Sequence, residues 1–226
     1  SLVGSEMCIR DRSYCDLLFY VDATPGSSID DPERPSIPDE GDKEEPKPDE
    51  DENVTGTLAF EDIWPSGGDY DMNDVIVEYE RKVYFDKKNI VTKIVDEFTP
   101  VHDGATYVNA FAYQIDAAQI GDKITLPEGA ILEKETSSII VMSNAKQNIG
   151  NKYVVTREFN GSFLKNQLLS YNPYIIVKYS QGEQNRTEVH LPKHKATAYA
   201  NQSLIGSNDD AYYIDRKGAY PFAIDI

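Results

Sequence analysis

The stretch from Phe60 to Tyr79, FEDIWPSGGDYDMNDVIVEY, is the feature that most constrains how this chain can fold. It holds the only tryptophan, Trp64, a Gly-Gly pair and five acidic residues before position 75. It ends in an apolar run rich in β-branched residues, which is typical of a buried strand. We therefore expect an acidic loop that leads into the first strand of a β domain.

Oxygen-bearing side chains recur at alternate positions in the second half of this loop, at Asp69, Asp71 and Asn73, with Asp74 next. Alternate residues of a turning loop can point their oxygens at one centre, and calcium binds six to eight oxygens at about 2.3–2.6 Å. Asp62 is placed to fold back and add a carboxylate, while Gly67 and Gly68 permit positive φ and a close approach of the backbone to an ion. The alternative is an Asp- and Gly-rich turn whose carboxylates face water.

The composition restricts the partners of the protein. The 226 residues carry a formal net charge of −17, which suits divalent cations. It argues against nucleic acid, whose phosphates require clustered Lys and Arg, and against anionic membrane surfaces. A hydrophobic content of 40% can supply a core, but no run reaches the roughly 18 apolar residues of a membrane span. Cys8 and Cys15 lie ahead of the main fold, so no disulfide framework is expected in it.

Three segments are expected ahead of the main domain. Residues 1–13 resemble the translated read-through of a sequencing adaptor and are interpreted as a non-native leader. Residues 14–22 are interpreted as a remnant strand of an upstream domain, because DLLFYV echoes the DVIVEY after the acidic loop; a chance apolar hexamer is the alternative. Residues 23–53 are predicted to be a disordered, Pro-rich acidic linker, since 13 acidic and 3 basic residues lie between Asp22 and Glu52.

From residue 54 to residue 226, runs of β-branched and aromatic residues alternate with turn-forming residues. We expect strands at 56–60, 75–85, 90–98, 107–115, 139–142, 153–159, 174–179, 187–191 and 222–226, and short helical turns at 117–120 and 162–169. No segment keeps the period of about 3.6 residues that an amphipathic helix requires. Residues 54–226 are therefore predicted to form one all-β domain, a mostly antiparallel, jelly-roll-like β-sandwich.

Catalytic patterns are weak in this sequence. His190 and His194 are four positions apart, a zinc spacing on a helix, but Pro192 and the strand-like residues before it remove the helix, so two exposed histidines are expected. No nucleophile motif is present, and no carboxylate pair is singled out for glycoside hydrolysis. We therefore do not predict an enzyme.

A second oxygen-rich turn, Asn208-Asp209-Asp210, precedes two tyrosines, Tyr212 and Tyr213. Its carboxylates are either further ligands or parts of a simple turn. The tyrosines are candidates for stacking on sugar rings, although core packing is the commoner role of such aromatics.

The residues from Leu58 onward resemble the LruC domain, a bacterial domain of unassigned function in cell-surface lipoproteins and secreted proteins. FEDIWP at Phe60–Pro65 and GDYDMND at Gly68–Asp74 match its opening signature. Later matches follow in order at Asn109–Ala112, Asn172–Val177, Glu188–Pro192, Asn208–Asp210 and Tyr220–Ile224. The family prefers Asn-Gly-Phe-Gly where this chain has NAFA, and it continues past the last segment, so we expect the domain to be incomplete at its C-terminal end.

The resemblance implies an extracytoplasmic setting, with a signal or lipoprotein anchor upstream, and it favours calcium. It also favours a role for the downstream acidic pair. The predicted metal ligands are therefore Asp62, Asp69, Asp71, Asn73, Asp74, Asp209 and Asp210, and Trp64 and Pro65 are predicted to anchor the loop to the core.

The predicted function is a calcium-stabilised binding or structural module, monomeric, with a glycan or another surface component as its partner class. A carbohydrate-active enzyme that uses paired carboxylates, and a spacer domain without metal, are the alternatives.

Overall fold

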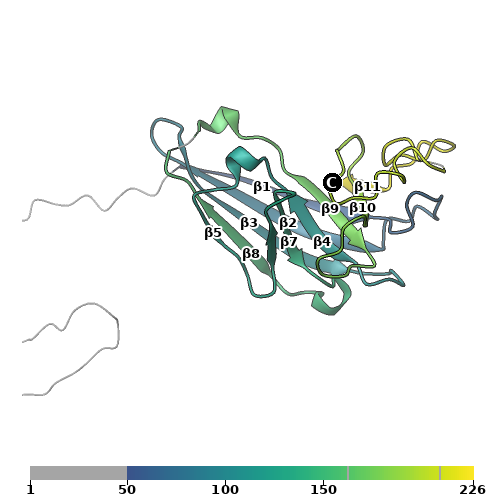
Figure 1. Cartoon of the computed structure of the whole chain (residues 1–226). Helices are drawn as coiled ribbons and strands as arrows, with labels where there is room; N and C mark the ends of the chain where they lie inside the picture. The colour runs from purple at the N-terminus through teal and green to yellow at the C-terminus, as the bar shows by residue number, and fades with distance from the viewer. Residues whose placement is uncertain (1–49, 162, 209) are drawn as a thin grey trace, which may run out of the picture. The chain divides into compact units, whose positions relative to one another are not determined.

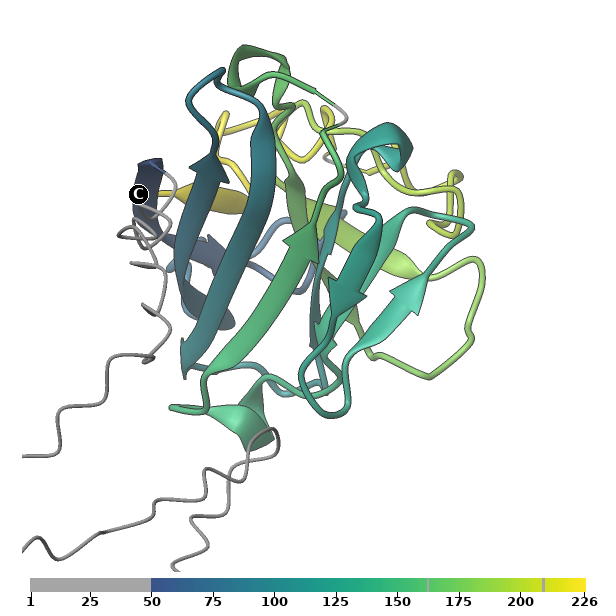
Figure 2. The same ribbon diagram turned by 90° about the vertical axis from the view of Figure 1, so that its left-hand side faces the viewer.

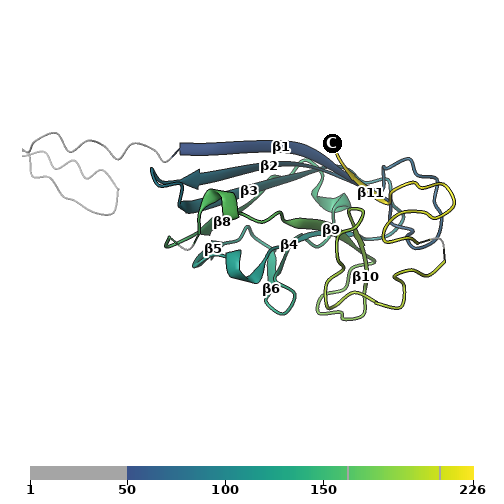
Figure 3. The same cartoon turned by 90° about the horizontal axis from the view of Figure 1, so that it is seen from above.

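The computed structural model describes residues 50–161, 163–208 and 210–226, so the leader, the remnant strand and most of the expected linker lie outside the described residues. Within them the chain forms two antiparallel β-sheets packed face to face (Figure 1, Figure 3). The expected all-β antiparallel sandwich is confirmed. None of the helices in the described ranges is long and apolar enough to cross a membrane.

Six strands form the first sheet, in the spatial order β11-β1-β2-β3-β8-β5. Their bounds are β1 Glu50–Phe60, β2 Val75–Phe85, β3 Val91–His102, β5 Lys123–Thr125, β8 Tyr153–Glu158 and β11 Ala223–Asp225. The last strand pairs with the first, from Leu58↔Asp225 to Phe60↔Ala223, and this edge of the sheet is seen in Figure 2.

Five strands form the second sheet, in the spatial order β10-β9-β4-β7-β6. Their bounds are β4 Ala110–Gln114, β6 Ile131–Glu133, β7 Ser138–Met142, β9 Asn172–Val177 and β10 Thr187–His190. Short 3-10 helices lie in the connections at Ala117–Gln119, Lys146–Asn148 and Lys165–Gln167. The first three strands form a meander, and from β3 onward the chain crosses repeatedly between the sheets.

The core lies between the sheets because alternate strand residues point inward. Val75 and Val77 of β2 are fully buried and belong to the same apolar cluster as Phe111, Ile139 and Ile175 of the second sheet. Burying a side chain of this size stabilises the fold by about 1.5–3 kcal/mol. The β-branched runs of the sequence thus supply both strand preference and core volume.

A buried ion group interrupts this apolar core. Asp96 of β3 accepts hydrogen bonds from Arg81 Nε of β2 at 2.5 Å and from Arg157 Nη2 of β8 at 3.1 Å. Tyr113 of β4, in the other sheet, donates its hydroxyl to Asp96 at 3.1 Å. Burial raises the pKa of Asp96, but the charges of Arg81 and Arg157 bring it below its ordinary value. The ionised carboxylate therefore ties both sheets together.

The sequence misplaced some element boundaries. β1 begins at Glu50, four residues before the expected start of the domain. The last four residues of the predicted linker at 23–53 therefore belong to a strand. β1 pairs with β2 along its whole length, beginning at Glu50↔Phe85, and this pairing orders residues that have no apolar content of their own. The three-residue strands β5 and β6 were not expected, because only their pairing with β8 and β7 defines them.

Candidate metal centre

The acidic loop, residues 61–74, connects β1 to β2 and lies at one end of the sandwich beside residues 210–222 (Figure 1, Figure 3). Three ring contacts join them. Trp64 lies 4.7 Å from Tyr213 between ring centroids, and Tyr70 lies 5.2 Å from Tyr220 and 5.5 Å from Phe222. The loop is therefore packed on one side against the C-terminal part of the chain.

Three carboxylates converge in this loop. One oxygen each from Glu61, Asp69 and Asp71 lies within 4.8 Å of the others. Two oxygens bound to one calcium ion at about 2.4 Å can be no more than about 4.8 Å apart, so the spacing fits a shared cation. Glu61 is buried, whereas Asp69 and Asp71 are exposed, so the group is closed on the protein side and open to solvent on the other.

Glu61 is the buried member of the group, with 0% of its surface exposed. Its Oε1 accepts the backbone N–H of Met72 at 2.6 Å, while its Oε2 has no hydrogen-bond donor in the part of the chain that the structure describes. Burial raises the pKa of Glu61 to about 7. The hydrogen bond from Met72 lowers this pKa, while the negative charges of nearby Asp residues raise it further. A buried acceptor without a donor costs about 1–3 kcal/mol, and a bound cation would remove that cost.

The loop turns at residues that the sequence did not indicate. Positive φ occurs at Tyr70 (55°) and Met72 (56°), not at Gly67 or Gly68 as expected. The reason for a glycine at 68 is space, because an added Cβ would lie 2.7 Å from Ile63 Cδ1 and 3.0 Å from Glu61 Oε2. A larger residue at 68 would have to displace the side chain of Ile63, which is 39% exposed, and would press on the carboxylate of Glu61.

The other predicted ligands of the loop, Asp62, Asn73 and Asp74, make hydrogen bonds around the group of three carboxylates. Asp62 is buried and accepts Asn109 Nδ2 at 2.7 Å on Oδ2, and its backbone N–H donates to Asp74 Oδ2 at 2.8 Å. Asn73 donates its side-chain amide to Asp71 Oδ2. Burial and the charge of Asp62 raise the pKa of Asp74, while the backbone hydrogen bond lowers it. These three residues orient the loop and are not in the group that meets within 4.8 Å.

The structure places Asp210 in a different role from the predicted one, and Asp209 lies outside the described residues. Asp210 is fully buried, and backbone or indole donors occupy both of its oxygens. Oδ1 accepts Trp64 Nε1 at 2.8 Å and the N–H of Tyr213 at 2.6 Å, and Oδ2 accepts the N–H of Gly206 at 2.6 Å. Asp210 is therefore a tether for the loop.

The aromatic residues of this end divide between core and surface. Trp64 is 3% exposed and lies in the main core, as an anchor should, and its peptide bond to Pro65 is cis. Tyr213 is fully buried, so the expectation that it could stack on a sugar does not fit its position. Tyr212 is 38% exposed and keeps an accessible ring.

Sequence reasoning missed Glu61 as a member of the site. The D-x-D-x-N spacing predicts ligands in the second half of the loop, whereas Glu61 lies at the start of the loop, directly after the last residue of β1. It joins the group because the loop folds back over 11 positions and brings Met72 to its carboxylate. The only cue was its place beside Asp62 in the FED triplet at the start of the loop.

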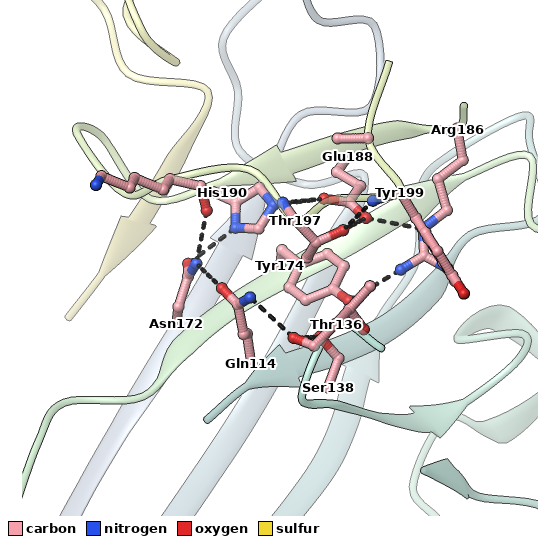
Figure 4. Close-up of polar contacts among 12 residues, drawn as sticks. Gln114, Thr136, Ser138, Asn172, Tyr174, Arg186, Glu188, His190, Thr197 and Tyr199 are labelled. Carbon is pink, nitrogen blue, oxygen red and sulfur yellow. Dashed lines mark hydrogen bonds and ion pairs between the residues drawn. The ribbon is translucent and has the colours of Figure 1, made fainter. Parts of the chain in front are cut away.

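A second polar cluster lies on the outer face of the second sheet (Figure 4). His190 of β10 was expected to be exposed, but it is fully buried, because the segment after β10 folds back over this face. Its ring nitrogens lie 2.8 Å from Asn172 Oδ1 and 3.0 Å from Glu188 Oε2. His194 instead faces the carbonyl of Pro192 at 3.4 Å, so the two histidines do not form a zinc pair.

A family model described as "Domain of unknown function (DUF4842)" matches residues 89–226, more than half of the chain. The chain belongs to the DUF4842 family. The DUF4842 match begins after the acidic loop and includes the Asp210 tether and the His190 cluster. No curated protein sequence matches the chain.

Among solved structures, the DUF4842 chain is similar to a crystal structure described as a "putative lipoprotein" from Bacteroides ovatus, with a TM-score of 0.55 and 16% sequence identity. The alignment covers 78% of this chain and 65% of that one, so the chain spans just under two thirds of the Bacteroides ovatus protein. At this level of identity the likeness concerns the fold alone.

Proposed function

We propose that this domain is a calcium-stabilised binding or structural module of a bacterial cell-surface or secreted protein. One observation carries the proposal. The fully buried carboxylate of Glu61 has an oxygen that no donor of the described residues reaches, and it lies within 4.8 Å of two exposed carboxylates, those of Asp69 and Asp71. Three carboxylates so close repel one another when ionised, and a divalent cation would turn this repulsion into attraction.

The oxygen-only group favours calcium among the common divalent cations. Calcium accepts six to eight oxygens in irregular arrangements, while magnesium demands a near-ideal octahedron and zinc prefers nitrogen and sulfur. Water can complete the coordination on the open side, where Asp69 and Asp71 are exposed. The ion would hold the acidic loop in place. Calcium sites of extracellular modules bind at roughly 10⁻⁴ to 10⁻³ M, and we expect this range.

The proposed location is extracytoplasmic. The resemblance to the LruC domain and the description of the Bacteroides ovatus protein both support it. In that setting calcium is available outside the cell, and a glycan or another surface component is the partner class that we propose. Tyr220, which contacts Tyr70 of the acidic loop, is 55% exposed, and Tyr212, which contacts Tyr213, is 38% exposed. Both offer rings for such a partner.

A carbohydrate-active enzyme is the second candidate, and one observation favours it. The pKa of Glu61 is raised to about 7, as in a general acid, and other carboxylates lie close by. Hydrolysis of glycans that disappears in Glu61→Gln, in the absence of calcium, would favour this candidate over the structural module.

The test is calcium binding by the full chain, followed by calorimetry and thermal unfolding. At 100 times the Kd, calcium should stabilise the fold by about 2.7 kcal/mol, which raises the Tm of a domain of this size by roughly 5–10 °C. The Asp69→Asn/Asp71→Asn variant should lose this shift. Glu128→Gln, which removes an exposed charge outside the loop, should keep it. A wild-type Tm that is the same in calcium and in chelator would refute the proposal.

A further inference from the structure

The cluster around His190 is a closed chain of hydrogen bonds under the segment that follows β10 (Figure 4). Glu188 and His190 are 0% exposed, and Thr197 of the covering segment is 1% exposed. The proton content of this cluster can be counted, because backbone carbonyls fix the direction of its hydrogen bonds.

The count begins at a carbonyl that can only accept. Gln114 Nε2 donates to the carbonyl of Thr136 at 2.9 Å, so Gln114 Oε1 faces Asn172 Nδ2 at 3.2 Å. Asn172 Nδ2 also donates to the carbonyl of Lys195 at 2.8 Å, which fixes the amide orientation a second time. Asn172 Oδ1 therefore accepts from His190, and His190 Nδ1 must carry a hydrogen.

The other ring nitrogen also faces an acceptor. His190 Nε2 lies 3.0 Å from Glu188 Oε2. The carboxylate already accepts Arg186 Nε at 2.7 Å, the Thr197 hydroxyl at 2.7 Å and the Thr197 N–H at 2.9 Å, which is the pattern of an ionised group. A neutral ring would set the lone pair of Nε2 against those of Oε2, without a proton between them.

The charge balance leads to the same conclusion. Arg186 also binds Glu133 through both terminal nitrogens, at 2.6 and 2.8 Å. Two carboxylates and one guanidinium leave one negative charge, and a protonated His190 cancels it. The ring of Tyr174 stacks on the imidazole at 4.4 Å and 15°, and Tyr213 lies on it at 5.3 Å, an aromatic environment that attracts a cation.

We propose that His190 is a buried imidazolium at neutral pH and acts as a proton-dependent latch, which holds the segment Leu191–Ala200 on the second sheet through Glu188 and Thr197. The proton keeps the Glu188 carboxylate charged but neutralised, and Thr197 binds to that carboxylate with both its hydroxyl and its N–H. Loss of the proton leaves a net negative charge under the segment and loosens it.

Opposing effects act on the His190 ring. Removal from water lowers the pKa of His190, and the charges of His194 and Arg186 lower it too, whereas the hydrogen bond and charge of Glu188 raise it. Glu133, Tyr174 and Tyr213 are the other titratable groups around the ring, and burial raises the pKa of both tyrosines. The hydrogen bond and charge of Glu188 outweigh burial and raise the pKa of His190, because a neutral ring fits neither the hydrogen bonds nor the charge balance of the cluster.

Long-range proton–nitrogen NMR of the histidine rings in the full chain tests the protonation state. The chain has 3 histidines, so the spectra of His102→Gln and His194→Gln identify the signals of His190 in the unsubstituted protein by elimination. At pH 7 we expect both nitrogens of His190 to carry hydrogens. A His190 ring with one bare nitrogen at pH 7 would overturn the proposal.

Amide hydrogen exchange of Thr197 tests the latch. Corrected for the intrinsic rate, exchange of this amide should accelerate at least tenfold as the pH rises through the titration of His190. The buried amide of Tyr113 in β4 serves as the internal control and should keep its protection factor. Protection of Thr197 that stays constant while His190 loses its proton would overturn the latch, whatever the protonation state at pH 7.

Discussion

Trp64 donates its indole N–H to Asp210 Oδ1 at 2.8 Å, across 146 positions of sequence, and this bond ties the acidic loop to the C-terminal segment. Both partners are buried, and Tyr213, whose N–H donates to the same oxygen, packs its ring on the indole. The geometry of the candidate metal centre therefore depends on residues far from it in the chain.

Loss of this bond should loosen the end of the sandwich. Trp64→Phe keeps a ring in the core but removes the donor, so we expect a loss of about 1–3 kcal/mol in the free energy of unfolding, measured in urea. Trypsin should also cut faster after Arg216 and Lys217, which are exposed in the tethered segment. Tyr212→Phe alters a half-exposed ring nearby and should change stability by less than about 0.5 kcal/mol. Equal stability of the two variants would contradict the role of the tether.

The raised pKa of Glu61 predicts the pH dependence of the calcium-free protein. Because the folded-state pKa is about 7 against 4.5 for the free group, the folded protein holds this proton to higher pH. The stabilisation is complete below 4.5 and is lost as the pH rises through about 7, by on the order of 3 kcal/mol. Burial also raises the pKa of Asp74 and Asp103, which adds to the same trend.

Comparison with Glu61→Gln, which mimics the protonated acid, isolates this contribution. In chelator between pH 5 and pH 8, the wild-type protein should lose more stability in urea than the variant does. Calcium should abolish the difference in slope, because the ion replaces the proton. Parallel pH profiles of the two proteins in chelator would show that Glu61 ionises normally.

The buried ion group of the core should be sensitive to loss of its carboxylate. Asp96→Asn leaves the buried Arg81 and Arg157 without a countercharge, and we expect a loss of about 3–5 kcal/mol in urea unfolding. Glu158→Gln, which breaks the exposed pair with Lys123 at 2.8 Å, should cost less than about 1 kcal/mol. If both substitutions cost the same, Asp96 does not hold the sheets together.

Gly104 sets the position of Asn73 from outside the loop. An added Cβ would lie 2.6 Å from Asn73 Oδ1 and 3.1 Å from its carbonyl oxygen, so Gly104→Ala must displace the side chain of Asn73, which donates to Asp71 Oδ2. We expect the variant to bind calcium at least threefold more weakly in calorimetry. Gly129→Ala, at φ +80° with no neighbour within 4 Å of the new Cβ, should lose about 1 kcal/mol of stability but keep its calcium affinity. Unchanged calcium affinity in Gly104→Ala would show that the position of Asn73 does not affect the metal site.

Much of the fold could be predicted from residue patterns. The β-branched run that begins at Val75 predicted a strand, because β-branched and aromatic residues are enriched in strands. Strands were expected at 75–85 and 90–98, and the chain turns between them at Asp86, which accepts the backbone N–H groups of Lys88 and Ile90 at 2.8 and 2.9 Å. The short strands β5 and β6 were missed, because three residues carry no period and only a partner strand makes them regular.

The sequence by itself determined that the chain forms an antiparallel β-sandwich with an acidic loop after its first strand, since periodicity and local composition are properties of neighbouring residues. Only the tertiary structure decided which acidic residues meet in the candidate metal centre and which form hydrogen bonds elsewhere. It brought Glu61 to Asp69 and Asp71, assigned Asp210 to Trp64, and buried His190 beside Glu188. The physical reason is that the partner of a buried polar atom is chosen by the folded chain as a whole, at sequence separations on which local spacing has no bearing.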